Sequence, residues 1–177
     1  MINITLPDGS VKQFQEAVTA MDIAKSISEG LARSVLSANV NGEVWDSNRI
    51  IEKDSTIKLN TWNDIEGKET FWHSSAHLLA SAISELYPNA KFGIGPSIEN
   101  GFYYDIDFGD SQLSSEDFAK IEQKMQDLVK EGIQIKRHNI SKKDALKMFS
   151  EKEETYKVEL IEELEDGTIT LYESGKF

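Results

Sequence analysis

Apolar and polar residues alternate over much of the first third of the chain, a pattern typical of short β-strands. Residues 2–14, INITLPDGSVKQF, alternate on both sides of PDGS, a sequence suited to a tight turn. Residues 34–46 alternate around Asn41-Gly42, the strongest two-residue hairpin signal. The pattern therefore predicts two β-hairpins.

A helix and a further strand complete this region. Residues 19–32 carry apolar side chains at helical spacing, with Thr19 suited to the N-cap and Gly30 suited to the position after the helix end. Residues 55–61, STIKLNT, alternate again. Several strands around one helix indicate a β-grasp (ubiquitin-like) α+β domain over residues 1–61.

The rest of the chain mixes helical and strand-like patterns. A helix is predicted from about Glu69 to Tyr87, where Pro88 ends it. Residues 114–132 form a clear amphipathic pattern with a serine cap and a terminal glycine. The other predicted elements are a strand from Gly101 to Phe108, a strand over 133–140, a short helix over 141–151, and strands over 155–164 and 168–174 that flank Asp166-Gly167.

These elements suggest two domains. The polar stretch over residues 62–68 is interpreted as a linker. Residues 69–177 would then form an α+β domain in which helices pack on an antiparallel sheet. Because the chain stops soon after a strand-like segment, we expect this second domain to be incomplete at its C-terminal end.

Composition limits the function. The chain has 177 residues and a net charge of −12, whereas a free-standing nucleic-acid binder usually carries a basic surface. Any nucleic-acid contact would need a local basic pocket or a neighbouring domain. The absence of cysteine excludes disulfides and cysteine-based zinc sites within the chain. With no apolar run near the roughly 20 residues of a membrane helix, we expect a cytoplasmic protein without a membrane partner.

His73 and His77 are two of the three histidines in the chain, and they lie one turn apart on the predicted helix. Their side chains would stack roughly 6 Å apart beside its apolar face, where they can converge on one metal ion, water or substrate group. Zinc proteases carry a glutamate after the first histidine of this pattern, but Ser74 follows His73 here, which disfavours a protease. For an isolated pair, a structural role at the edge of a core is the commoner one.

Several motifs occur in a fixed order along the chain, and this context favours a functional role for the two helix histidines over a structural one. The helix HSSAHLLASAI is followed by KFGIGPSIENGFYYDID and then by ETYKVELI. This succession resembles the second N-terminal domain of bacterial threonyl-tRNA synthetases. The preceding ITLPDGS, MDIAKSI and VNGEVWD resemble the TGS domain that opens the same enzymes. The resemblance covers essentially the whole chain.

The resemblance implies an editing domain that hydrolyses serine wrongly attached to the threonine tRNA. It assigns catalytic roles to His73 and His77, which would orient the water or a ribose hydroxyl, and to Lys157 of TYKV, which would bind the developing oxyanion or the substrate. Three further residues would contact the substrate: Gly95, Pro96 and Tyr104.

Each assignment has a structural alternative. Lys157 could be a solvated charge on a strand, Tyr104 a core residue, and the GIGP sequence an ordinary tight turn. His138 lies between charged neighbours on the predicted strand over 133–140 and is interpreted as a surface residue.

The family completes its site with a C-x-x-x-H segment, yet this chain has no cysteine and no histidine after His138. We therefore expect the fragment to deacylate weakly or not at all. Two histidines are too few ligands for a tight zinc site, so we expect no metal or other cofactor in this fragment. The resemblance places ATP, Mg²⁺ and a catalytic zinc in a catalytic domain that the chain lacks.

The implied partner is the acceptor end of tRNA(Thr), bound through a full-length homodimeric enzyme, whereas the fragment is compatible with a monomer. Two other hypotheses stay open: a stand-alone TGS-containing interaction or regulatory module with structural histidines, and a free-standing editing hydrolase. A C-x-x-x-H segment followed by synthetase motifs beyond Phe177 would decide for the ligase.

Overall fold

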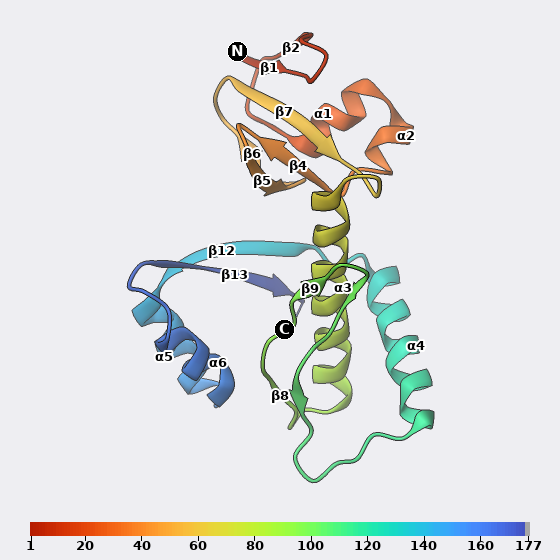
Figure 1. Ribbon diagram of the computed structural model, residues 1–177, viewed down its shortest axis with the longest axis vertical. Helices are drawn as coiled ribbons and strands as arrows, with labels where there is room; N and C mark the ends of the chain where they lie inside the picture. Colours follow the sequence, from red (N-terminus) through yellow and green to blue (C-terminus); the bar gives the residue numbers. More distant parts are fainter. Residues whose placement is uncertain (176–177) are drawn as a thin grey trace. The chain divides into compact units, whose positions relative to one another are not determined.

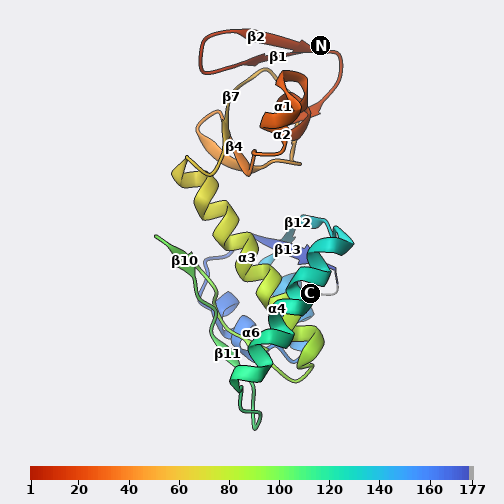
Figure 2. The same cartoon turned by 90° about the vertical axis from the view of Figure 1, so that its right-hand side faces the viewer.

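The computed structural model describes residues 1–175, which divide into two compact units. The first unit comprises residues 1–72, and the second begins at His73. The boundary falls within one helix, α3 (Ile65–Leu86), which contributes its first turns to the first unit and its remaining turns to the second. Figure 1 labels most elements of the two units, and Figure 2 adds β10 and β11.

The first unit contains a five-stranded sheet in the order β2-β1-β7-β4-β5. The central β1 and β7 run parallel, and the other neighbours are antiparallel. This mixed sheet, with a helix between its two hairpins, is the predicted β-grasp fold. The elements are β1 (Ile2–Thr5), β2 (Val11–Phe14), β3 (Val18–Thr19), α1 (Ala20–Ile27), α2 (Glu29–Ala32), β4 (Ser37–Val40), β5 (Glu43–Asp46), β6 (Ile50–Ile51) and β7 (Ser55–Asn60).

Local signals explain most of this unit. The turn between β4 and β5 places Asn41 and Gly42 at positive φ, as a two-residue hairpin turn requires. Thr19 caps α1 as predicted, and its hydroxyl accepts the Asp22 N–H at 3.1 Å. The buried core consists of aliphatic side chains, mainly isoleucine and valine, from β1, β3, α1, β4, β6 and β7.

The prediction for Gly30 is wrong. Helix α1 ends at Ile27, and Ser28 takes an extended conformation there. The Ser28 hydroxyl then accepts the Leu31 N–H at 3.0 Å and starts the short helix α2, which contains Gly30. A second N-cap therefore ends the first helix before the glycine is reached.

Helix α3 begins at Ile65, four residues before the predicted start at Glu69, so part of the predicted linker is helical. The Lys68 N–H already donates to the Asp64 carbonyl at 3.1 Å. Gly67 lies so close to the Thr61 carbonyl oxygen that a side chain there would overlap it. This close contact between Gly67 and Thr61 lies within the first unit, and it holds the first turn of α3 against the segment that follows β7.

The second unit pairs helices with short strands and one long antiparallel ribbon. Helices α3 and α4 lie side by side (Figures 1 and 2), and Ala80, Ile83, Phe92 and Ile121 form the buried core there. The elements that follow α3 are β8 (Lys91–Phe92), β9 (Ser97–Ile98), β10 (Gly101–Phe102), β11 (Ile106–Asp107), α4 (Ser115–Glu131), β12 (Ile135–Ser141), α5 (Lys142–Glu151), α6 (Thr155–Glu162) and β13 (Thr168–Ser174).

Two strand predictions in this unit need correction. Residues 155–164 do not form a strand but lie largely in α6, and β13 pairs instead with β12 over seven residues, from Ile135–Ser174 to Ser141–Thr168. The segment TYKVELIEEL has apolar residues at both strand and helix spacing, and such short runs are ambiguous. The predicted strand from Gly101 to Phe108 is broken into the two short strands β10 and β11.

Candidate functional site

The second unit contains an open cavity of about 800 Å³. Helix α3 forms one wall, the β12–β13 ribbon another, and α5, α6 and the chain from Pro88 to Tyr104 close the rest. Its lining includes the following titratable and aromatic residues: His73, His77, Phe92, Tyr104, His138, Phe149, Glu154, Lys157, Tyr172 and Glu173. Four of the six residues predicted for the site from the sequence line this cavity together: His73, His77, Tyr104 and Lys157.

The two α3 histidines stack as their spacing predicts. Their ring centroids are 4.8 Å apart with an interplanar angle of 13°, and their Nε2 atoms are 3.0 Å apart. At this distance one Nε2 must carry a hydrogen and the other must accept it, because two N–H groups would repel. The Tyr172 ring lies 6.3 Å from the His73 ring and 6.1 Å from the His77 ring. The pair therefore shares one proton beside an aromatic wall.

The environment keeps His77 neutral. Burial lowers the pKa of His77 from 6.5 to about 4, and the nearby charges of His73 and Lys157 act in the same direction. Near pH 7 the His77 imidazole is thus uncharged and able to accept a proton. His73 is the more exposed of the two rings.

Lys157 points into the cavity rather than into solvent. Its ammonium lies 5.6 Å from the Phe92 ring centroid and 5.3 Å from that of Phe149, and its side chain is only 20% exposed. The Glu154 carboxylate lies 3.8 Å away. Burial lowers the pKa of Lys157, and the Glu154 charge opposes that shift. The alternative that Lys157 is a solvated surface charge is therefore wrong, as is its placement on a strand.

Tyr104 lines the cavity, whereas Gly95 and Pro96 are not among its lining residues. The Tyr104 ring packs edge-on against Phe92 at 5.8 Å, and burial together with the Glu154 charge raises the pKa of Tyr104 to about 12. Gly95 lies directly against the Tyr104 ring, so that a side chain at this position would overlap it. The structure thus gives Gly95 a packing role next to a residue of the cavity wall.

The sequence pattern does not reveal several polar and aromatic residues that line the cavity. His138, interpreted as a surface residue, is indeed exposed, and it also lines the cavity, with its Nε2 3.0 Å from a Glu173 carboxylate oxygen. Tyr172 and Glu154 also line it, and no sequence motif points to either residue. Glu154 precedes Lys157 by three residues, a spacing that pairs side chains only on a helix. Because the sequence pattern predicts a strand over residues 155–164, it does not indicate the pairing of Glu154 with Lys157.

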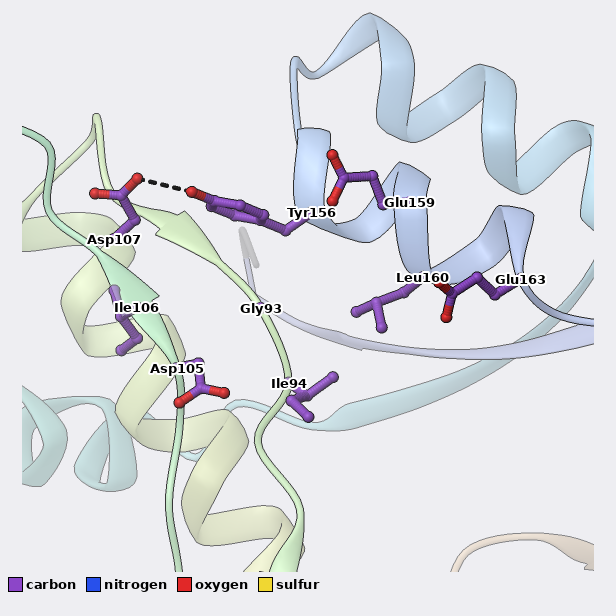
Figure 3. Close-up of a pocket in the computed structure, with 9 residues that line it drawn as sticks. All are labelled: Gly93, Ile94, Asp105, Ile106, Asp107, Tyr156, Glu159, Leu160 and Glu163. Atoms are coloured by element: carbon purple, nitrogen blue, oxygen red, sulfur yellow. Dashed lines mark hydrogen bonds between the residues drawn. The ribbon is translucent and has the colours of Figure 1, made fainter.

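An adjacent face of α6 borders a second cavity of about 500 Å³, shown in Figure 3, and Leu160 lines both cavities. Four carboxylates line it: Asp105, Asp107, Glu159 and Glu163. The Tyr156 hydroxyl donates to Asp107 at 3.0 Å and ties α6 to β11. Helix α6 is thus a wall shared by two cavities, one with histidines and a lysine, the other acidic.

Two further observations concern residues 1–175. Within this range no group of three or more His, Cys, Asp or Glu side chains is arranged to hold a metal ion. No helix in the same range combines the length and apolar character needed to cross a membrane.

The β-grasp unit belongs to a recognised class of domain, since residues 2–61 match the TGS domain. Over all 177 residues the chain is 59% identical to threonine–tRNA ligase of Cytophaga hutchinsonii and 59% identical to that of Parabacteroides distasonis. It is 54% identical over the same length to threonine–tRNA ligase of Bacteroides fragilis. In each case the match covers 100% of this chain and 27% of the relative. The chain therefore spans about a quarter of the length of the curated relatives it matches.

Proposed function

We propose that the chain is the N-terminal part of a threonine–tRNA ligase and that its second unit hydrolyses serine from mischarged tRNA(Thr). The observation that carries the proposal is the convergence of the His73–His77 pair and Lys157 on one cavity. The identity of 54–59% to threonine–tRNA ligases over the whole chain supports it.

The chemical need for a second site is simple. Serine lacks one methyl group of threonine, and one methyl group is worth only about 1–3 kcal/mol of discrimination in a binding pocket. A synthetic site alone would therefore charge some tRNA with serine. A separate hydrolytic site removes that product.

The residues of the cavity suit ester hydrolysis. His77, kept neutral by burial, and His73, whose Nε2 lies 3.0 Å from the His77 Nε2, can orient a water molecule and accept its proton as the water attacks the ester carbonyl carbon. The Lys157 ammonium can stabilise the negative charge that develops on the carbonyl oxygen. Collapse of the tetrahedral intermediate breaks the bond to the ribose oxygen, which takes up a proton, and releases serine. Tyr104 stays protonated and can donate a hydrogen bond to the substrate.

The remaining activities belong to the rest of the proposed enzyme. ATP, Mg²⁺ and a catalytic zinc would act in a catalytic domain, and the acceptor end of tRNA(Thr) would enter the cavity while other regions supply most of the tRNA affinity. This division agrees with the net charge of −12. We propose a cytoplasmic, homodimeric full-length enzyme.

The present chain holds part of the hydrolytic set. The threonyl-tRNA synthetase motif C-x-x-x-H has no counterpart here, because the chain contains no cysteine. We therefore expect little or no deacylation by the chain alone, and much faster deacylation by a ligase that begins with it.

The test compares seryl-tRNA(Thr) hydrolysis by such a ligase with hydrolysis by its His73→Ala and Lys157→Met variants. Both variants should lose most of the deacylation rate while they keep threonine activation, which reports on the catalytic domain. His138→Ala is a matched control, since it removes a lining histidine outside the stacked pair. Unchanged deacylation in His73→Ala and Lys157→Met would mean that these residues have only structural roles.

A further inference from the structure

Glu154 occupies the N-cap of α6 without acting as a cap. Its side chain makes no capping hydrogen bond, and glutamate is not among the residues that helix N-caps favour. The side chain instead lines the histidine cavity and is 20% exposed. The local structure of α6 therefore gives no reason for a glutamate at this position.

The Glu154 carboxylate presents a buried acceptor to the cavity. Its Oε2 atom is buried and has no hydrogen-bond partner among residues 1–175. The Lys157 ammonium, at 3.8 Å, gives charge attraction but lies beyond hydrogen-bond distance. A buried carboxylate oxygen without a donor is unfavourable, and a carboxylate can accept several donors at once. A ligand with a strong donor would satisfy it.

The other charged groups that line the cavity limit the chemical class of ligand that can bind at Glu154. Glu173, the second lining carboxylate, already pairs with His138 at 3.0 Å. Lys152 and Lys157 provide positive charge, and His77 is neutral. Glu154 is thus the anionic group with an open acceptor, which suits a cationic N–H donor.

We propose that Glu154 binds the α-ammonium group of the aminoacyl ester, so that the cavity accepts esters with a free amino group and discriminates against N-acylated ones. This inference rests on the proposed function, because the seryl ester carries that ammonium group one carbon away from the reacting carbonyl. With the ammonium at Glu154, the carbonyl is directed to the neighbouring Lys157. Glu154 then fixes the orientation of the ester at the cation that stabilises its oxyanion.

The test measures binding to the chain itself, without catalysis. The probes are an adenosine that carries serine on its ribose through a stable amide and the same compound with an N-acetyl group on the serine. The chain should bind the free-amino probe at least about tenfold more tightly, the value of one charge-assisted hydrogen bond. In Glu154→Gln, which keeps the shape and removes the charge, the ratio of the two dissociation constants should fall close to one.

Glu159→Gln is the matched control. It removes the same charge from the same helix, but Glu159 faces the other cavity (Figure 3), so the selectivity of the unaltered chain should persist. Selectivity that persists in Glu154→Gln would overturn the proposal. So would equal weakening of both probes, which would mean that Glu154 only holds Lys157, and so would the failure of both probes to bind. Deacylation by the longer ligase is measured separately, so these failures are distinct from a failure of the proposed function.

Discussion

Replacing His77 by glutamine should remove much of the acid sensitivity of the second unit. Burial lowers the pKa of His77 from 6.5 to about 4 in the folded protein. Below pH 6.5 the unfolded chain binds a proton at this position that the folded chain does not, so stability falls as the pH drops towards 4 and changes no further below that. At pH 4 this difference amounts to about 3 kcal/mol.

The measurement is urea unfolding of the chain and of His77→Gln at pH 7.5 and pH 4. All three tryptophans lie in the first unit, so amide NMR signals from residues 73–175 are followed instead of fluorescence. The unaltered chain should lose about 3 kcal/mol more than the variant between the two pH values, since the other titrating groups are common to both. Equal losses, or an NMR titration of the His77 ring near pH 6.5, would refute the buried, neutral imidazole.

Three substitutions test close packing and helix capping, one in the first unit and two in the second. Gly67→Ala should destabilise the first unit by more than about 2 kcal/mol despite the better helix propensity of alanine, because its methyl group overlaps the Thr61 carbonyl; tryptophan-detected unfolding measures this. Gly95→Ala should cost about 1–3 kcal/mol and shift the Tyr104 ring, visible as changed Tyr104 NMR signals; unchanged signals would contradict the close contact. Ser114→Ala removes the hydroxyl that donates to Asp117 at 2.7 Å at the start of α4 and should cost about 1 kcal/mol in urea unfolding, whereas no loss would mean that this hydrogen bond is dispensable.

The β-grasp unit could be predicted because its signals are local. Hairpin turns such as Asn41-Gly42 and the cap at Thr19 act over a few residues, and strand alternation assigns the buried face directly. The failure at Gly30 has the same origin, since a competing local cap at Ser28 ended the helix first.

The site was predictable only in part, for physical reasons. The stacking of His73 and His77 follows from helix geometry alone, so it needed no tertiary information. The shared proton and the lowered pKa of His77 depend on burial and on Lys157, which lies far along the chain. Because residues 155–164 were assigned to a strand, the helical spacing that joins Glu154 to Lys157 was lost.

The acidic residues of the second cavity illustrate the same limit. Asp105 and Asp107 lie near β11, whereas Glu159 and Glu163 belong to the α6 region, and no sequence pattern links the two groups. The Tyr156–Asp107 hydrogen bond brings them together in the fold. Spatial clusters of this kind arise from tertiary packing and leave no periodic signal.

The central claim is that the cavity of His73, His77 and Lys157 hydrolyses seryl esters on tRNA. The most direct measurement is the single-turnover rate of seryl-tRNA(Thr) deacylation by a threonine–tRNA ligase that begins with this chain and by its His73→Ala/His77→Ala double variant, with threonyl-tRNA(Thr) as the parallel substrate. Rapid hydrolysis of the seryl ester alone, lost in the double variant while threonine activation persists, is the predicted result. Equal seryl-tRNA hydrolysis by both proteins, or none by the unaltered ligase, would contradict it.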